Sequence, residues 1–262
     1  MPLKKQNKIA IALSIGSFIP LLAWINSYSS SCISLVFPII TMCILCVSVM
    51  ELTVKKRECL ARSYFVENTF FYRLFSSRKL VLIKSIFLSI LLGTSLALSL
   101  VSWNTEIIYL LFVDIFILSW IYSRTLSTLT GTIKENVKFV IAKDISVSIN
   151  SSFLLITLLI IQFYTPLPQY VDASLQTTLT DALKTFSTEC VITNFLLTIN
   201  TQKDAFSWWT MLSVSTHIQN KNLKYVAWFV FLLSNGLATF AFSRYTLQIL
   251  DLVRFFGEKN DK

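Results

Sequence analysis

The sequence is poor in the residues that interrupt helices and in those that build metal and acid–base sites. Among its 262 residues there are five glycines, five prolines and a single histidine. Charged residues make up 14% of the chain, whereas soluble domains usually contain roughly 25%. The low charge argues against a soluble protein, and the scarcity of glycine and proline favours long, uninterrupted helices.

The motifs of the common enzyme classes are also missing. The chain has no Walker lysine loop, no Gly-rich dinucleotide turn, no H-E-x-x-H motif and no G-x-S-x-G elbow. The five cysteines show no zinc or haem spacing in a suitable loop, since Cys43 and Cys46 lie inside an apolar span, and no Cys, His or carboxylate lies at ligand spacing from His217. We therefore expect no catalytic residue, no metal ion and no cofactor, and we rank an intramembrane enzyme below the non-enzymatic alternatives.

What the chain does contain is long apolar blocks. Hydrophobic residues make up 54% of the sequence, and the mean hydropathy is +0.65. The blocks are about as long as the ~20 residues that cross a bilayer as a helix. They predict an all-α, polytopic integral membrane protein in which residues 1–262 form a single helical membrane domain. The expected spans, about six, are 9–26, 33–54, 81–103, 107–123, the end of a helix over 132–164, and 225–247.

Positive charge gives this topology an orientation. The net charge is +9, and 19 of the 23 Lys and Arg residues fall in segments that share one side when the N-terminus is inside. Because Lys and Arg are concentrated in cytoplasmic loops, we expect both termini to be cytoplasmic. The basic N-terminus and first apolar block imitate a signal peptide, but Pro20, Trp24 and the second span close behind favour a retained helix. We expect the bacterial cytoplasmic (inner) membrane and no binding to nucleic acid.

Two basic segments are expected on the cytoplasmic side. Residues 55–80 mix Lys and Arg with aromatic residues, which is typical of a segment lying among lipid headgroups. We expect this segment to contact anionic lipid or an acidic partner; the alternative is that its charges only set the topology. Residues 124–144 are expected to be a cytoplasmic helical extension from which the fifth span enters the membrane. The residues assigned to lipid or partner contact are Arg57, Arg62, Arg73, Arg78 and Lys79.

Residues 165–224 are predicted to form a helical extracytoplasmic cap between the fifth and sixth spans. Apolar residues at helical spacing over 171–190 predict an amphipathic helix on the outer surface. The apolar stretch 191–199 is too short to cross a membrane, so we expect it to be re-entrant or the core of the cap. Cys32 and Cys190 both fall on the oxidising side, where they could form a disulfide, but nothing in the sequence brings them together, and we rank free thiols above the disulfide.

A stripe of small residues marks the third span. Ser85, Ser89, Gly93 and Ala97 recur every four positions, so they share one face of a helix. Small side chains let a second helix backbone approach closely. We predict that these residues form a helix packing seam, although the same pattern also arises by chance in a serine-rich span.

Asp114 is the one carboxylate in the middle of a predicted span. An ionised Asp at the centre of a membrane helix costs about 2.5–3.5 kcal/mol, so its side chain should face the other helices. Counting inward from the outer ends places several hydroxyl and amide side chains at the same depth. We expect them to form one polar layer, used either to fix helix packing or as an ion or proton site. The layer comprises Asp114, Asn235, Thr94 or Ser95, Thr41 and Thr157.

These features favour a non-enzymatic membrane subunit over an enzyme. Our first hypothesis is a scaffold or sensor subunit of a bacterial inner-membrane complex, such as an immunity or phage-defence component, in contact with membrane lipids and with a protein partner or a second copy of itself. The second hypothesis is a channel or transporter subunit that uses the Asp114 layer. Six spans with both termini inside and a structured outer loop before the last helix resemble the topology of the membrane subunit of an ABC-2-like exporter. That resemblance implies a separate ATPase partner.

Overall fold

The computed structural model describes residues 16, 18–64, 66, 69–70, 72, 77–164, 168–172, 174–216 and 221–259. Every regular element in these ranges is a helix, so the all-α prediction is confirmed for the described chain. A short apolar helix, Phe18–Ser27, precedes the others. The further elements are η1 (Cys32–Leu35), α2 (Val36–Tyr64), α4 (Arg78–Ser102), α5 (Thr105–Leu129), α6 (Glu135–Tyr164), α7 (Leu175–Leu183), α8 (Val191–Thr216) and α9 (Lys221–Lys259).

Within the described residues, four helices are long and apolar enough to cross a membrane, which indicates an integral membrane protein. Of the first expected span, 9–26, the structure describes residues 16 and 18–26, whereas the last, 225–247, lies within α9, where many side chains are not described. The four candidate spans are Cys32–Arg57, Arg78–Ser102, Thr105–Leu129 and Val137–Gln162.

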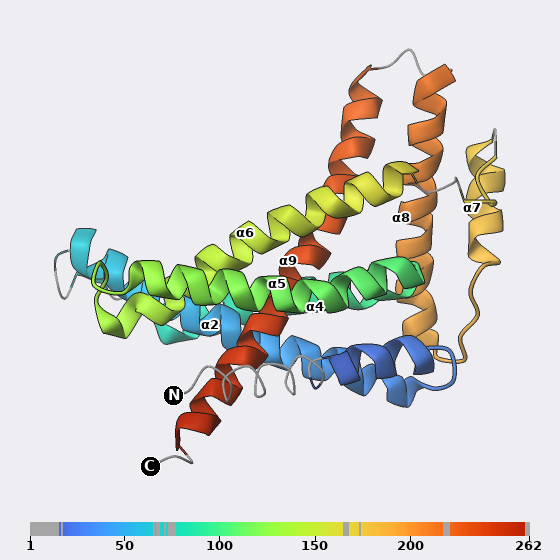
Figure 1. Cartoon of the computed structure of the whole chain (residues 1–262). Coiled ribbons are helices and arrows are strands. Elements are labelled where there is room, and N and C mark those ends of the chain that lie inside the picture. Colours follow the sequence, from blue (N-terminus) through green and yellow to red (C-terminus); the bar gives the residue numbers. More distant parts are fainter. Residues whose placement is uncertain are drawn as a thin grey trace.

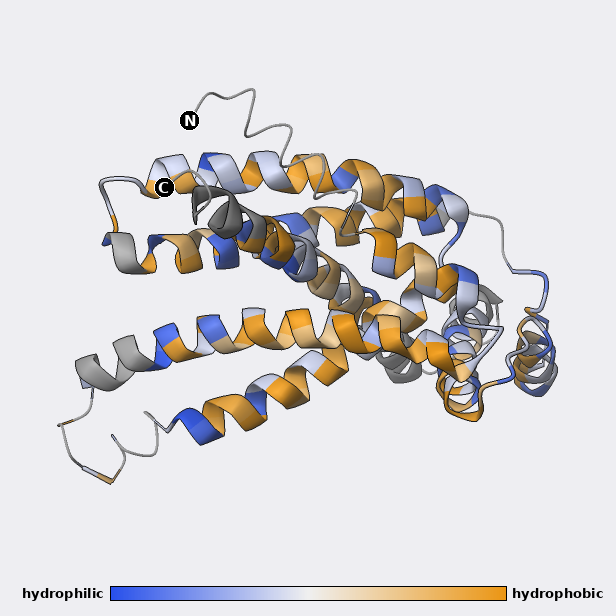
Figure 2. Ribbon diagram, turned by 90° about the horizontal axis from the view of Figure 1, so that it is seen from below, coloured by the Kyte–Doolittle hydropathy of each residue, from blue (hydrophilic) through white to orange (hydrophobic). Residues whose placement is uncertain are grey.

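The helices form a bundle crossed by two oblique members. Figure 1 shows α2, α4 and α5 side by side, with α6 and α9 running across them at an angle. The end of α2 and the start of α4 lie at the same end of the bundle as the turn between α5 and α6. We call this the basic end, because Lys55, Lys56, Arg78 and Arg124 are found there. Figure 2 shows apolar residues concentrated along the helix middles and hydrophilic residues toward this end.

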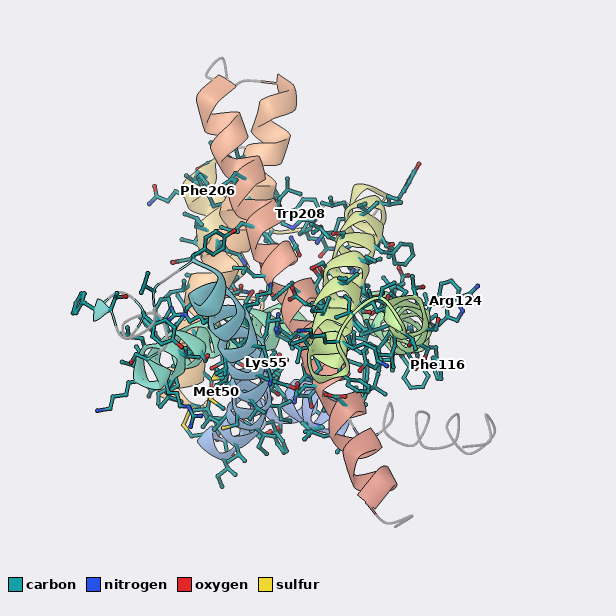
Figure 3. All side chains as sticks on the ribbon, turned by 90° about the vertical axis from the view of Figure 1, so that its left-hand side faces the viewer. Met50, Lys55, Phe116, Arg124, Phe206 and Trp208 are labelled. Atoms are coloured by element: carbon teal, nitrogen blue, oxygen red, sulfur yellow. A yellow bond between two sulfur atoms is a disulfide. The ribbon has the colours of Figure 1, made fainter. Side chains whose placement is uncertain are left out.

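The core of the bundle is built around α9. Ala238, Ala241, Phe242 and Tyr245 of this helix are buried, and the small alanines let neighbouring helices approach its backbone. The same core takes in buried leucines and isoleucines of α2, α4, α5 and α6. Other large apolar residues face outward: Phe116 is 44% exposed, and Figure 3 shows it with Arg124 at the periphery of the bundle. An apolar exterior of this kind suits contact with lipid.

The segment between α6 and α9 differs from the sequence-based expectation. The predicted amphipathic helix over 171–190 is reduced to the nine residues of α7. The apolar stretch 191–199 is the start of one continuous helix of 26 residues, α8. Figures 1 and 2 show α8 crossing the ends of α2, α4 and α5 that lie opposite the basic end, with α7 packed outside it. The helix continues through a polar stretch because the side chains of Asn200, Lys203 and Asp204 bond to one another.

The expectation of free thiols at Cys32 and Cys190 is wrong, because the structure joins them in a disulfide. The two Cα atoms are 4.9 Å apart although 158 residues separate them in sequence. Tertiary hydrogen bonds bring the two segments together: Glu189 N donates to the backbone oxygen of Ser29 at 3.3 Å, and Thr188 Oγ1 donates to that of Tyr28 at 3.1 Å. The disulfide therefore ties the start of α8 to η1, a pairing that the sequence alone does not reveal.

The two basic segments continue the helices of the bundle. α2 runs on to Tyr64, ten residues beyond the expected end of its span at 54, and α5 runs on to Leu129. Gly131 makes the turn into α6 with a φ of +87°, a conformation that favours glycine. Arg78 and Lys79 are exposed and Arg57 is half-buried. Arg73 and the side chain of Arg62 lie outside the described residues.

Candidate functional site

The small-residue stripe of α4 lies inside the bundle. Ser85, Ser89, Gly93 and Ala97 are all buried. A Cβ atom built on Gly93 would collide with the Met42 side chain of α2 and lie 3.4 Å from its Cα, so only glycine permits the observed approach of these helices. Further along the stripe, the backbone oxygen of Ala97 accepts a hydrogen bond of 2.8 Å from Trp24 Nε1. The stripe therefore contacts α2 on one side and the Phe18–Ser27 helix on another.

Asp114 is fully buried and binds a residue that the predicted layer did not include. Asn150 Nδ2 of α6 donates a hydrogen bond of 2.8 Å to Asp114 Oδ2 and a second of 3.0 Å to Ser243 Oγ of α9. The three residues come from α5, α6 and α9, and all are buried. We call them the Asp114 triad. Asp114 Oδ1 and Asn150 Oδ1 are buried acceptors with no donor among the described residues.

The other members of the predicted layer do not meet at Asp114. The hydroxyls of Thr41, Thr94 and Thr157 donate hydrogen bonds to backbone oxygens of their own helices. Ser95 is half-buried beside Thr94. Asn235 is buried on α9, about 12 Å along the helix from Ser243, at 1.5 Å per residue. The structure thus replaces the predicted partners with Asn150 and Ser243.

Helix inclination explains this difference. Counting residues from the helix ends gives depth correctly only when the helices are parallel to the membrane normal and of similar length. α6 and α9 are oblique, and α9 has 39 residues, so equal counts correspond to different depths. The sequence did contain a usable signal: Val147, Asn150, Leu154 and Leu158 recur at helical spacing, which places Asn150 on the buried face of α6.

A second cluster lies nearer the basic end and consists of charged side chains. Lys143 of α6 is 4% exposed, and its Nζ lies 3.0 Å from Glu51 Oε2 and 2.7 Å from Asp251 Oδ2. The same Nζ donates a hydrogen bond of 3.0 Å to Gln248 Oε1. A buried ammonium is tolerated here because carboxylates from two other helices neutralise its charge. We group these residues with the ion pairs of the neighbouring Asp144 and call the whole set the Lys143 network. It comprises Glu51, Lys56, Lys143, Asp144, Arg244, Gln248 and Asp251.

The Lys143 network also contains two ion pairs of Asp144, the residue that follows Lys143. Asp144 Oδ2 lies 2.8 Å from Lys56 Nζ, and Asp144 Oδ1 lies 3.5 Å from Arg244 Nη1. Arg244 is 4% exposed and follows Ser243 of the Asp114 triad directly in sequence. The guanidinium pairs with Asp144 and lies over the ring of Phe240, with 5.6 Å between Cζ and the ring centroid. The network and the triad are therefore consecutive along α6 and α9.

At the opposite end of the bundle there is a cavity of about 480 Å³, which we call the α8 pocket. It opens among the last turn of α4, the start of α5, the end of α6, the segment 168–170, α8 and α9. Trp103, Trp208 and Tyr170 contribute aromatic surface, and Asn235 of α9 lines the same cavity. Figure 3 shows Trp208 in the space between α9 and α6. A cavity of this size lies within the range of about 300–1,000 Å³ that is typical of small-molecule sites.

The charged residues of the α8 pocket are linked to each other. Lys203 Nζ lies 3.1 Å from Asp204 Oδ1, and Asn200 Nδ2 donates to Asp204 Oδ2 at 3.2 Å. Asn200 Nδ2 also donates to Ser102 Oγ at 2.8 Å, which anchors the cluster to α4. Burial raises the pKa of the Asp204 carboxyl, and the nearby Lys203 opposes that rise. Burial and the charge of Asp204 raise the pKa of Tyr170 to about 12, so its hydroxyl stays neutral.

One helix contributes to all three sites. α9 places Asn235 in the α8 pocket, Ser243 in the Asp114 triad, and Arg244, Gln248 and Asp251 in the Lys143 network. From Asn235 to Asp251 the helix covers about 24 Å. No family model, curated protein or solved structure matches this chain. The sites are accordingly interpreted from their own geometry.

Proposed function

We propose that this chain is a non-enzymatic subunit of a bacterial inner-membrane complex and that it acts as a sensor or scaffold. In this proposal it crosses the membrane about six times, with both termini in the cytoplasm. The Lys143 network then lies near the cytoplasmic side, and the α8 pocket lies on the outside. The distribution of Lys and Arg supports this orientation, because 19 of the 23 fall in the segments expected on the cytoplasmic side.

The observation that carries the proposal is the continuity of α9. A ligand in the α8 pocket contacts the same helix whose far end is held by Lys143 and Asp144 of α6 through ion pairs and by the Asp114 triad. A shift of α9 along its axis changes the pairing distances in the network, which is a way to pass a signal between two sites. Ion pairs suit this role because buried charges favour discrete pairings over intermediate positions.

The basic end is the proposed contact surface for lipid or for an acidic partner. Arg78 and Lys79 are exposed at the start of α4, and Arg57 is half-buried near the end of α2. Each cationic side chain near an anionic surface contributes about 1 kcal/mol, so several together give a substantial attraction. Arg62 and Arg73 belong to the same basic segment of the sequence.

Orientation is tested by labelling single cysteines in intact cells. Cys43, Cys46 and Cys59 are replaced, and the disulfide-bonded pair is kept, because it ties α8 to η1. A cysteine in place of the exposed Gln202 should react with a membrane-impermeant maleimide, and one in place of Asn136 should not. Labelling at position 136 instead of 202 would overturn the orientation and the cytoplasmic placement of the network together.

The subunit role is tested by native detergent extraction and purification of the tagged chain. A stoichiometric partner that is lost when Arg78 and Lys79 are changed to Gln, and kept when the exposed Lys184 is changed to Gln, supports the proposal. The proposal is contradicted if the tagged chain restores function to a deletion strain and is then purified from that strain as a monodisperse protein without a partner. A bound ATPase as the partner would favour the exporter topology.

A channel or transporter is the second candidate, favoured by one specific observation. Asp114 Oδ1 and Asn150 Oδ1 are buried oxygens with no donor among the described residues, and such acceptors attract a proton or a cation. The test is ion or proton flux into liposomes that contain only this chain. Flux that depends on Asp114 supports the transporter; its absence in correctly folded protein leaves the sensor as the conclusion.

A further inference from the structure

Half of the sixteen residues that line the α8 pocket carry neutral aliphatic hydroxyl or amide side chains. Hydroxyl and amide side chains from α4, the α4–α5 connection, α6, α8 and the connecting segments all reach it, including Ser99, Asn104, Gln162, Gln169, Thr185 and Thr201. Hydroxyls and amides each offer both donors and acceptors. Gln162 Oε1 is a buried acceptor with no donor among the described residues. Such a lining suits a ligand that carries several uncharged donors and acceptors of its own.

The two charged residues in the pocket leave no net charge for the ligand to balance. Lys203 and Asp204 form an ion pair with each other and share Asn200 as a hydrogen-bonding neighbour. An anionic or cationic ligand would have to draw one partner out of this half-buried pair and leave the other charge uncompensated, which opposes its binding. A neutral hydroxylated ligand can accept a hydrogen bond from Lys203 and donate one to Asp204 without separating the pair. Charge therefore selects against ionic ligands.

Aromatic side chains supply the remaining walls. Trp103 and Trp208 line the cavity together with Tyr170, whose hydroxyl remains a neutral donor and acceptor. The C–H faces of a sugar ring stack on indole rings, while its hydroxyl groups reach surrounding amides and hydroxyls. The cavity, at about 480 Å³, has room for one or two such rings.

We propose that the α8 pocket binds a neutral, polyhydroxylated group, namely a saccharide of one or two rings, and that this is the ligand sensed by the protein. This inference rests on the sensor proposal for its biological meaning, but the binding itself is independent of any partner. Two sources share the chemistry. A free saccharide reaches the pocket from solution, whereas the sugar headgroup of a glycolipid reaches it from the membrane, since the pocket lies at the ends of the candidate spans.

The experiment measures binding to the full-length chain by isothermal titration calorimetry. Maltose and N-acetylglucosamine are titrated into protein in detergent, with glutamate, choline and phosphate as charged comparisons. The glycolipid source is examined by melting temperature in nanodiscs with and without glucosyl-diacylglycerol. Saturable binding of either neutral sugar, or a rise in melting temperature with the glucolipid, supports the inference and also identifies the source. Preference for a charged comparison, or no response to any neutral sugar or to the glucolipid, overturns it.

Two variants assign the binding to the pocket. Thr201→Trp fills the cavity from α8, and Gln202→Trp adds the same side chain at the adjacent exposed position as a matched control. Thr201→Trp should weaken binding by about tenfold or more, and Gln202→Trp should leave it unchanged. Tyr170→Phe keeps the volume but removes one hydroxyl, so it should weaken binding by about threefold to tenfold. Equal affinities for all these proteins would place the sugar elsewhere.

The binding and purification experiments distinguish a failure of the saccharide inference from a failure of the sensor proposal. If the sugar binds in the pocket but never alters the amount of partner recovered by native purification, the sensor role fails and the binding site stands. If a partner is recovered and depends on Arg78 and Lys79, while no neutral sugar or glucolipid binds, the saccharide inference fails and the subunit role stands.

Discussion

Asn150 donates one hydrogen bond to Asp114 at 2.8 Å and another to Ser243 at 3.0 Å, so a single amide joins three helices. Asn150 lies 36 residues from Asp114 and 93 residues from Ser243 in sequence, and the three side chains meet in the buried interior. Interhelical hydrogen bonds of this kind contribute about 0.6–2 kcal/mol in membrane proteins. Along α9, the contact lies between Asn235 of the α8 pocket and the Lys143 network.

Replacing Asp114 tests whether its charge or its hydrogen bond is needed. Asp114→Asn retains an oxygen that accepts from Asn150, so thermal stability in detergent should stay within about 1 kcal/mol of the parent protein. Asp114→Leu removes the acceptor and should cost about 1–3 kcal/mol. If both variants lose the same stability, the hydrogen bond is not the main contribution of Asp114. Under the sensor proposal Asp114→Asn should also retain the partner.

The Lys143 network should be sensitive to loss of its central cation. Lys143→Met leaves Glu51 and Asp251 without their partner; because these two carboxylates are 39% and 24% exposed, the cost should be about 1–3 kcal/mol, below that of a fully buried pair. Lys184 forms an exposed i,i+3 pair with Asp181, so Lys184→Met is the matched control and should cost less than about 0.5 kcal/mol. Chemical denaturation in detergent checks both values. A cost for Lys143→Met as small as the control's would show that the network does not hold α6 to α9.

Gly93 should tolerate no side chain at the contact between α4 and α2. A Cβ atom there collides with Met42, so Gly93→Ala should cost about 1–3 kcal/mol and Gly93→Leu more. Gly236 offers the control, since its nearest neighbour would be Leu155 Cδ2 at an ordinary 3.7 Å, and Gly236→Ala should be accepted. Melting temperature and size-exclusion profile are the measurements. A normal melting temperature and size-exclusion profile for Gly93→Leu would show that the small-residue stripe does not determine how α4 packs on α2.

Loss of the disulfide should loosen the layer formed by α7 and α8. Cys32→Ala opens a link across 158 residues, and removing such a link typically costs about 2–4 kcal/mol. Cys43→Ala, at an exposed cysteine of α2, is the control. Limited proteolysis between α7 and α8 should become faster in Cys32→Ala and not in Cys43→Ala. Equal proteolysis rates would mean that the backbone hydrogen bonds near Tyr28 and Glu189 hold the layer alone.

Asp204 should make stability depend on pH. Its pKa is raised by burial above the usual 3.8, so the folded state holds the proton more tightly than the unfolded state does. Its contribution to stability is present in full below the unfolded pKa and is lost as the pH rises through the folded pKa. Asp204→Asn should remove that loss, so its stability advantage over the parent grows as pH rises through this window. The measurement is the melting temperature as a function of pH, with Asp181→Asn on α7 as the control. Parallel changes in melting temperature for Asp204→Asn and the parent protein would contradict the prediction.

The helical membrane class could be predicted from the sequence because it depends on composition and on local periodicity. Long apolar blocks must be helical to satisfy backbone hydrogen bonds in lipid, and the helices from 33 to 164 follow those blocks closely. The segment 165–224 could not be predicted equally well. Its helices are held by the disulfide of Cys190 and by the cluster around Asp204, which are contacts between distant parts of the chain.

The candidate sites show the same division. Asp114 was identified from its cost in a membrane span, and it is indeed buried. Its partners were not identified, since inclined helices break the relation between residue count and depth. Lys143 lies on the buried face of α6, at helical spacing from Val147 and Asn150, but only the approach of Glu51 and Asp251 makes its burial tolerable.

The helical fold class, the position of four candidate spans, the basic end and the small-residue face of α4 can all be predicted from the sequence. These features follow from hydrophobicity, charge distribution and the helical repeat, which are local properties. The contacts of Asn150 with Asp114 and of Cys190 with Cys32, and the connection that α9 makes between the α8 pocket and the Lys143 network, are seen only in the folded chain. The reason is that helix inclination and crossing are set by packing among all the helices together, and no single segment encodes them.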